Sequence, residues 1–233
     1  MRRSHWLAIT ILALVTALRA LAQPPAAAYD IIIRGGTVVD GSGAPRFRSD
    51  VAVSGGSVVR IGNLSGARGA IEIDATGRFV TPGFINIHSH ATPDGLSTAA
   101  NMLTQGVTTE LLNADGAGPV DIRGQLAAAE TRGLAINIGA AIGFNSVWAE
   151  IVGLADRRPT PAEVERMREH LAIGLDHGAW GLSAGLDYKP GYYASTEDVI
   201  KVVDVARASR TFFTNHDRGL DRILLDRFKT CLM

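Results

Sequence analysis

The fold of this chain is decided by residues 82–90, which read PGFINIHSH. The stretch predicts a short apolar strand near 84–88, with His88 and His90 at its end. Side chains two positions apart in a strand project to the same face, roughly 6.5 to 7 Å apart along the chain. Two imidazoles so placed can bind one divalent metal ion, and the alternative is two unrelated polar residues at a strand end. A place at the C-terminal mouth of a barrel strand, where barrel active sites lie, favours the metal site.

The residues that follow alternate short apolar strands with helical stretches, which is typical of βαβ units and a parallel sheet. We predict strands near residues 84–88, 107–112, 134–140, 179–186 and 211–215. The clearest helix is predicted over 160–176, because Thr160 can cap it, Pro161 suits its first turn and Glu163 completes a capping box. A second helix is predicted over 195–208. The chain is therefore expected to be an α/β protein with about five β/α units, a partial (β/α)8 barrel.

A small β module is predicted over residues 29–80, ahead of the partial barrel at 81–218. Its sequence contains a duplication, DIIIRGGTVV at 30–39 and DVAVSGGSVV at 50–59. Each copy is expected to form a strand, a Gly-Gly turn and a second strand, since glycines supply the positive φ of a tight hairpin. A third pair of short strands is expected around residues 75–77. The module is interpreted as a scaffold without chemistry of its own.

The N-terminal residues 1–22 have the layout of a signal peptide. Two arginines precede an apolar run over 6–18, and the sequence ALA at 20–22 fits a cleavage site. The run is shorter than the roughly 20 apolar residues that cross a membrane. We therefore expect cleavage after residue 22, a linker over 23–28, no stable membrane anchor after cleavage, and an exported protein that is periplasmic or secreted.

The composition excludes several other classes of protein. The chain has 233 residues, 46% of them hydrophobic, and 23 basic and 23 acidic side chains give a net charge of +0. This is a globular composition, and the balanced charge offers no electrostatic footprint for nucleic acid. A single cysteine, Cys231, excludes an internal disulfide framework and a cysteine-rich zinc site.

Several motifs resemble the amidohydrolase superfamily, specifically the N-acyl-D-amino acid deacylases, or D-aminoacylases. They read GGTVVDGSG at 35–43, PGFINIHSH at 82–90, QGVTT at 105–109 and GAWGLSAGLDYKPGYYA at 178–194. The last stretch is the most specific, and the resemblance runs from about Tyr29 to Arg218. It implies a metal-dependent (β/α)8 barrel attached to a β-sandwich.

The resemblance assigns roles to individual residues of this chain. His88 and His90 resemble the metal pair of the first barrel strand, and His216 resembles the histidine ligand of the fifth. Arg218 resembles the family arginine whose planar fork suits a substrate carboxylate. The family positions also imply that three further side chains shape the substrate pocket, namely Ser183, Tyr188 and Tyr193.

Three positions depart from the family pattern. Asn86 stands where the family usually has aspartate, and Asp115 stands where many deacylases have a metal-binding cysteine. Asp115 is either an oxygen ligand for the metal or part of an Asp-Gly turn after a strand. Lys189 occupies a slot where related amidohydrolases carry a carboxylated lysine that bridges two metal ions, and the alternative is a solvated lysine before Pro190.

The resemblance implies hydrolysis of the linear amide bond of N-acyl-D-amino acids, or of similar acylated amino acids or peptides. Water activated by one or two Zn²⁺ ions, or by another divalent metal, would perform it. The family's catalytic aspartate, from the eighth strand, and a histidine ligand from the sixth have no match here, and residues 219–233 no longer resemble the family. We expect a truncated family member, weakly active or inactive alone, that self-associates through an unpaired strand.

Two other functions stay open at this point. Residues 181–185, GLSAG, satisfy the GxSxG pattern of serine hydrolases, which would make Ser183 a nucleophile. That motif needs a sharp turn at the serine, with a helix directly after it, and here Ser183 is expected inside a strand. The remaining hypothesis is a non-catalytic exported fragment, with a binding or structural role, that keeps part of a metal site.

Overall fold

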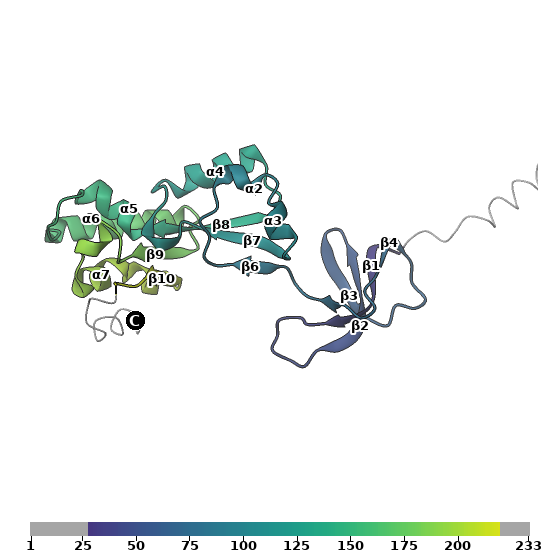
Figure 1. Ribbon diagram of the computed structural model, residues 1–233. Coiled ribbons are helices and arrows are strands. Elements are labelled where there is room, and N and C mark those ends of the chain that lie inside the picture. The colour runs from purple at the N-terminus through teal and green to yellow at the C-terminus, as the bar shows by residue number, and fades with distance from the viewer. Residues whose placement is uncertain (1–27, 220–233) are drawn as a thin grey trace, which may run out of the picture. The chain divides into compact units, whose positions relative to one another are not determined.

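The computed structural model describes residues 28–219, and these residues form two compact units (Figure 1). The first unit ends at Pro82 and the second begins at Gly83. The predicted signal peptide lies outside the described residues, and so do nearly all of the predicted linker and tail, Cys231 included. Among residues 28–219, no helix is both long enough and apolar enough to cross a membrane.

The first unit is a five-stranded sheet with the order β3-β2-β1-β4, in which β5 also pairs with β1. The strands are β1 (Tyr29–Val38), β2 (Phe47–Ser54), β3 (Ser57–Gly62), β4 (Gly69–Asp74) and β5 (Phe79–Val80). Its small core contains Ile32, Ala52 and Leu64, all of them buried. The β1 strand lies centrally because it pairs antiparallel with β2 and parallel with both β4 and β5.

The duplication in this unit folds differently in its two copies. The second copy forms the predicted hairpin, with Gly55 and Gly56 between β2 and β3 at φ values of 57° and 75°. The hairpin predicted in the first copy is wrong, because β1 runs straight through its Gly-Gly pair with a bulge in its pairing to β2. A Cβ atom on Gly36 would lie 2.4 Å from Val80 Cγ2, so close packing explains this glycine.

The third strand pair is likewise not a hairpin. Both β4 and β5 run parallel to β1 and follow one another along it, joined by a turn at residues 75–77. The turn bonds to its neighbours, since Ala75 N donates to Arg34 O and Arg78 N donates to Ala75 O, both at 2.9 Å. Alternating sequence predicts strands but does not say which strand is the partner.

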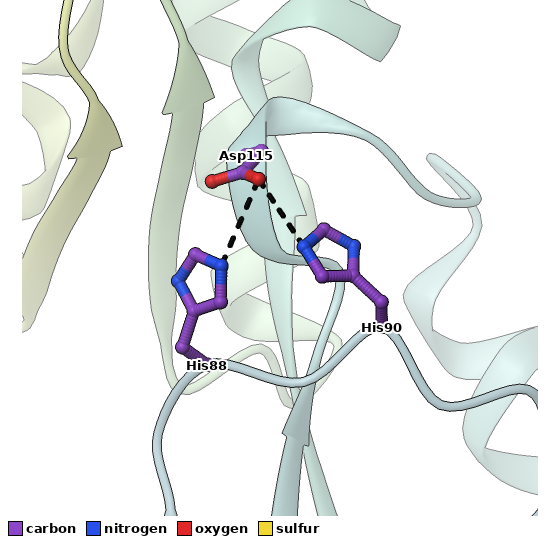
Figure 2. Close-up of side chains that lie close together, drawn as sticks. All are labelled: His88, His90 and Asp115. Carbon is purple, nitrogen blue, oxygen red and sulfur yellow. Dashed lines mark ion pairs between the residues drawn. The ribbon is translucent and has the colours of Figure 1, made fainter.

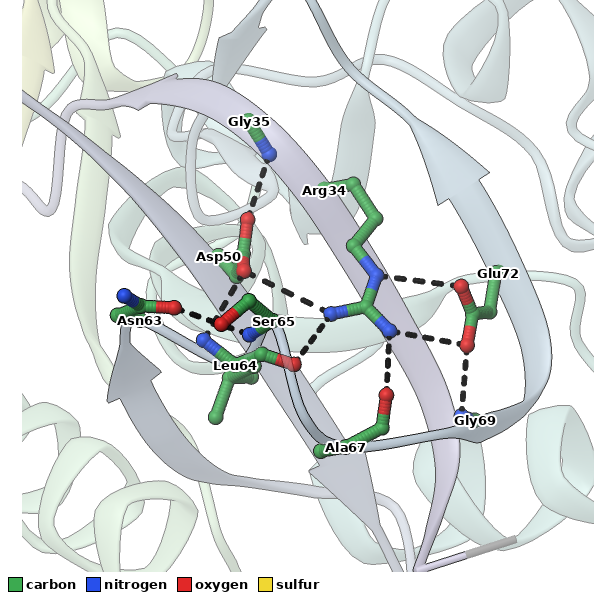
Figure 3. A network of polar contacts seen from close by, with 9 residues as sticks. All are labelled: Arg34, Gly35, Asp50, Asn63, Leu64, Ser65, Ala67, Gly69 and Glu72. Carbon is green, nitrogen blue, oxygen red and sulfur yellow. Dashed lines mark hydrogen bonds and ion pairs between the residues drawn. The ribbon is translucent and has the colours of Figure 1, made fainter.

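A polar network around Arg34 holds the first unit together (Figure 3). The Arg34 guanidinium lies 2.9 Å from Glu72 Oε1 on β4 and donates to the carbonyls of Leu64 and Ala67, both at 2.7 Å. Donation from Arg34 is the largest cause of a lowered pKa at Glu72. Asp50, on β2, lies 3.6 Å from the same guanidinium. The network therefore ties three strands and a loop together, which fits the scaffold role predicted for this unit.

The second unit is built on five parallel strands with the order β10-β9-β8-β7-β6. They are β6 (Phe84–Asn86), β7 (Val107–Leu112), β8 (Asn137–Gly143), β9 (Gly181–Gly185) and β10 (Phe212–His216). Neighbours in the sheet are neighbours in sequence, joined by helical segments, as in one side of a (β/α)8 barrel. The predicted α/β fold with a partial barrel is therefore confirmed.

Short and long helices connect these strands. They are α2 (Pro93–Leu96), α3 (Ala100–Leu103), η1 (Ala114–Gly116), α4 (Ile122–Arg132), α5 (Phe144–Ile151), α6 (Pro161–Asp176), η2 (Gly191–Tyr193), α7 (Thr196–Val203) and α8 (Val205–Ala208). The main core lies between the strands β8 and β9 and the helices α5 to α8, where Phe144, Trp148 and Leu171 are fully buried. Figure 1 shows α5, α6 and α7 grouped beside β9 and β10. Functional side chains can therefore gather at the carboxyl ends of the strands.

Several predicted boundaries differ from the structure, among them those of the strands predicted at 179–186 and 211–215, which are Gly181–Gly185 and Phe212–His216. The strand β8 begins three residues later than the predicted 134–140, because Leu134 and Ile136 pack with Leu96 before the strand starts. The strand β6 ends at Asn86, so both histidines of the first motif lie in the loop after it. The predicted helix 195–208 is divided into α7 and α8. An apolar run predicts burial more reliably than it predicts where a strand begins.

Helix α6 begins with the predicted capping box. Thr160 Oγ1 accepts a hydrogen bond from Glu163 N at 3.3 Å, and Glu163 Oε2 accepts one from Thr160 N at 2.8 Å. Arg157 donates to both carboxylate oxygens of Glu163, at 2.7 and 2.9 Å. Donation from Arg157, and then from Thr160, lowers the pKa of Glu163 from 4.5 to about 2.

Replacing Glu163 by glutamine should therefore destabilise the protein at neutral pH and lose this effect in acid. A carboxylate whose pKa falls on folding contributes stability above its unfolded pKa, and this contribution disappears as the pH drops from about 4.5 towards about 2. Thermal melting of the wild type and Glu163→Gln across this range measures the difference. Glu165→Gln, at an exposed position of the same helix, is the control. If the difference in melting temperature between the wild type and Glu163→Gln persisted unchanged at about pH 2, it would contradict a stabilising role of the ionised Glu163 carboxylate.

Candidate metal centre

The carboxyl ends of the parallel strands bring together side chains that are distant in sequence. His88 and His90 follow β6, Asp115 lies in the η1 turn after β7, and His216 is the last residue of β10. Because parallel strands end at the same edge of a sheet, these four residues meet there. The structure therefore gathers all the histidine and aspartate residues that the sequence predicts as metal ligands.

Asp115 lies at the centre of this group, and Figure 2 shows both histidines of the first motif directed at its carboxylate. Asp115 Oδ2 is 3.2 Å from His90 Nε2 and 3.7 Å from His88 Nε2. The two imidazole rings are 5.2 Å apart, centre to centre. One donor atom from each of the three residues lies within 4.8 Å of the other two. Two imidazoles and one carboxylate form a donor set that divalent metals such as Zn²⁺ accept, so these residues fit the metal that the resemblance implies.

The other oxygen of Asp115 faces a different imidazole. Asp115 Oδ1 lies 3.8 Å from His216 Nδ1, and Tyr188 OH lies 3.2 Å from the same nitrogen. The Tyr188 and His216 rings are 4.6 Å apart. The two carboxylate oxygens of Asp115 are thus directed at two separate sets of nitrogen donors, an arrangement that can serve one metal ion or two.

The backbone that carries Asp115 is in an uncommon conformation. Asp115 has φ +58° and Asn113 has φ +66°, both left-handed. Non-glycine residues in this region are strained by about 1 kcal/mol or more each, and such strain persists only where the surroundings fix it. Here Ser183 Oγ donates to Asn113 O at 2.6 Å and accepts from Gly116 N at 3.1 Å. One hydroxyl from β9 therefore pins both ends of the turn that presents the carboxylate.

This arrangement leaves Ser183 unsuited to act as a nucleophile. Its side chain is fully buried and its hydroxyl is committed to two backbone groups. It also lies within β9, with no helix directly after it, so the sharp turn that the GxSxG motif needs is not formed. The geometry favours Ser183 as a brace for the metal turn over both the nucleophile and the pocket-lining role.

Two polar residues that the sequence analysis did not single out support the same edge. Asn145, in α5, donates to Gly185 O at 2.8 Å and accepts from Gly185 N at 3.0 Å. These bonds fix the end of β9 against the helix that follows β8. A polar residue inside the apolar run at 141–148 is the sequence signal that could have identified it.

Glu110 is the second residue that sequence reasoning missed. It is fully buried on β7, and its Oε2 accepts a hydrogen bond from Asn86 Nδ2 at 2.9 Å. Asn86 Oδ1 in turn accepts from His88 N at 3.3 Å, and Glu110 Oε1 has no hydrogen-bond partner among the described residues. A buried carboxylate is costly unless it is paired, so its place beside the histidine loop marks a positioning contact. Asn86, which stands where the family usually has aspartate, is thus hydrogen-bonded to a carboxylate on the next strand.

Lys189 lines a pocket together with His90 and Asp115, whereas Arg218 contacts residues between η2 and the start of α7. Lys189 is exposed, with Nζ 5.8 Å from the centre of the Tyr193 ring. Arg218 is only 5% exposed, and its guanidinium donates to Ala194 O at 2.8 Å and to Thr196 Oγ1 at 3.4 Å. Carboxylation of Lys189 and substrate binding by Arg218 both stay predictions.

Known proteins share this arrangement of strands. No family model matches the chain. It is 32% identical over 217 residues to an N-acyl-D-glutamate deacylase of Alcaligenes xylosoxydans xylosoxydans, and 29% identical over 224 residues to a D-aminoacylase of the same organism. A crystal structure of D-aminoacylase, said to define a novel subset of amidohydrolases, matches with a TM-score of 0.79 at 28% identity. The chain is similar to the D-aminoacylases, a family of amidohydrolases, over most of its length.

The match to the D-aminoacylase family covers most of this chain and part of each relative. The two curated alignments cover 82% and 85% of this chain, but 44% and 46% of the relatives. An N-acyl-D-glutamate deacylase from Bordetella bronchiseptica, solved with zinc and a phosphonate mimic of the tetrahedral intermediate, has a TM-score of 0.71 at 28% identity over 45% of its length. The chain thus spans about half the length of the relatives it matches, and the predicted resemblance to this family is confirmed.

Ser183→Ala should loosen the turn that carries Asp115. Removing the hydroxyl leaves the buried Gly116 N without its acceptor, which is expected to destabilise the protein by about 1 to 3 kcal/mol. Thermal or denaturant unfolding measures this, with Ser209→Ala, at an exposed position, as the control.

A fluorophosphonate probe should leave the wild type unlabelled. Covalent labelling at Ser183 would restore the serine hydrolase hypothesis.

Proposed function

We propose that this chain belongs to a metal-dependent hydrolase that cleaves the linear amide bond of N-acyl-D-amino acids, or of similar acylated amino acids or peptides. The observation that carries the proposal is the convergence of His88, His90 and Asp115 at the carboxyl ends of two parallel strands. Support comes from the relatives, whose names describe deacylation of N-acyl-D-glutamate and N-acyl-D-aspartate. The relatives extend beyond the matched region, so the activity is proposed from the site.

The proposed metal is Zn²⁺, as one or two ions, held by His88, His90 and Asp115, with His216 on the other side of the carboxylate. A divalent ion bound there would lower the pKa of a water molecule and polarise the amide carbonyl. The turn fixed by Ser183 sets the direction of the carboxylate, so the ligand geometry is formed before the metal arrives. Solved relatives contain zinc in one case and copper in another, which supports a divalent metal without deciding which one.

The residues next to the metal group suit a small acylated substrate. Tyr188, whose hydroxyl contacts His216, lines the pocket next to the metal group, where the family resemblance predicts it to shape the substrate site. Ala117, Ala149 and Pro190 give the neighbouring pocket an apolar wall for an acyl chain. We also propose that the protein is exported, on the strength of the signal-peptide layout at residues 1–22.

Removing a ligand should abolish tight metal binding without unfolding the protein. Isothermal titration with Zn²⁺ or Co²⁺ is expected to show at least about tenfold weaker binding, or more than about 1.4 kcal/mol, for His90→Ala and Asp115→Ala. The matched control is His170→Ala, whose imidazole lies on α6 and pairs only weakly with Glu150, at 4.0 Å. Equal affinity in the wild type, His90→Ala and Asp115→Ala would contradict the metal centre.

The reaction is tested directly on acylated amino acids. Release of free amino acid from N-acetyl-D-methionine and from its L enantiomer can be followed by NMR, with Zn²⁺ or with excess chelator. Because the catalytic aspartate and one histidine ligand of the family have no match in this chain, we expect at most weak hydrolysis of the D substrate, which requires the metal, is lost in Asp115→Ala and is retained in His170→Ala. Hydrolysis that survives both the chelator and Asp115→Ala would contradict a metal-dependent mechanism.

A further inference from the structure

A pocket of about 430 Å³ opens beside the metal group. His90 and Asp115 line one part of it, and Tyr188, Lys189, Asn145 and Ser146 supply its other polar side chains. A volume in this range suits a small organic ligand. Since the pocket shares two residues with the metal group, a ligand in it lies next to the ion that the proposed function requires.

Most polar groups of the pocket are already committed to other parts of the protein. The Asn145 amide is engaged with the backbone of Gly185 and with Tyr188 O, at 3.3 Å. Tyr188 OH lies against His216. Neither the Lys189 ammonium nor the Ser146 hydroxyl has a hydrogen bond or ion pair within residues 28–219. The donors left for a ligand are therefore one cation and one hydroxyl.

The charges of the pocket favour an anion at the lysine. Of the residues that line it, Lys189 alone is a lysine or arginine, while the Asp115 carboxylate is directed at three imidazoles. The Tyr193 ring, 5.8 Å from Lys189 Nζ, stabilises the ammonium through its π face and limits its range. The expected arginine, Arg218, is buried, and two of its nitrogens donate to Ala194 and Thr196. Lys189 is consequently the cation that the pocket offers.

We propose that Lys189 binds a carboxylate of the acylated amino acid, while the amide to be cleaved lies at the metal group. This inference rests on the proposed function and deepens it, because it names the group that selects the substrate. The carboxylate is either the α-carboxylate, which every N-acyl amino acid has, or the side-chain carboxylate of an acidic one. In both cases Lys189 acts as an ammonium donor, and a carboxylated lysine could not take this role.

The experiment measures binding to the metal-loaded chain, because affinity does not depend on turnover. Dissociation constants are measured by titration calorimetry for N-acetyl-D-glutamate, N-acetyl-D-methionine and N-acetyl-D-methionine amide, which carry two, one and no carboxylates. The variants are Lys189→Met, Lys189→Arg and the control Lys201→Met, an exposed lysine on α7. Loss of a charge-assisted hydrogen bond at this exposed position is expected to weaken binding by about tenfold.

The expected result is weaker binding of the carboxylates in Lys189→Met, near wild-type binding in Lys189→Arg, and no change for the amide. Weakening of the glutamate ligand alone assigns Lys189 to the side-chain carboxylate, and equal weakening of both acids assigns it to the α-carboxylate. Unchanged constants in Lys189→Met, or metal binding that needs bicarbonate and loses this need in Lys189→Met, would overturn the proposal. Absence of metal binding in the wild type would instead contradict the proposed function.

Discussion

The candidate metal centre depends on one buried hydroxyl. Ser183, from β9, accepts from Gly116 N and donates to Asn113 O, so it closes the turn on both sides of Asp115. The turn is left-handed at two non-glycine residues, and without this brace the backbone would relax towards commoner conformations. Because the carboxylate then faces His88, His90 and His216 at once, its position relative to these three imidazoles depends on the contact between β9 and the turn after β7.

Buried polar contacts extend this support to the adjoining strands. Asn145 fixes the end of β9 through Gly185, and the Asn86–Glu110 pair joins β6 to β7 beside the backbone of His88. Such groups are costly to bury unless they are satisfied, so they select one arrangement of the strand ends over its alternatives. The apolar core between the sheet and the helices α5 to α8 supplies the stability, while these polar pairs define the geometry of the site.

Much of the second unit could be predicted, because hydrophobic period and capping signals are local. Sequence spacing predicts the strand at 107–112, the strand at 179–186 that the structure shortens to 181–185, the capping box at Thr160 and the paired histidines of the first motif. The hairpin predicted at the first Gly-Gly pair was wrong because Gly36 packs closely against Val80. A glycine in the sequence does not show whether it serves a turn or close packing. Glu110 escaped notice because burial of a charged residue inside a strand is decided by its neighbours.

The sequence by itself determined the family resemblance, the parallel-strand architecture and the two histidines that share one strand end, since these depend on residue type and period. The tertiary structure decided that Asp115 meets those histidines and His216, that Ser183 is a brace, and that Lys189 lines a pocket whose other donors are mostly used. Those contacts join residues from different strands, so they exist only once the sheet has set its register. The physical reason is that the direction of a metal-ligating side chain is set by the backbone turn that carries it and by the contacts that hold this turn in place.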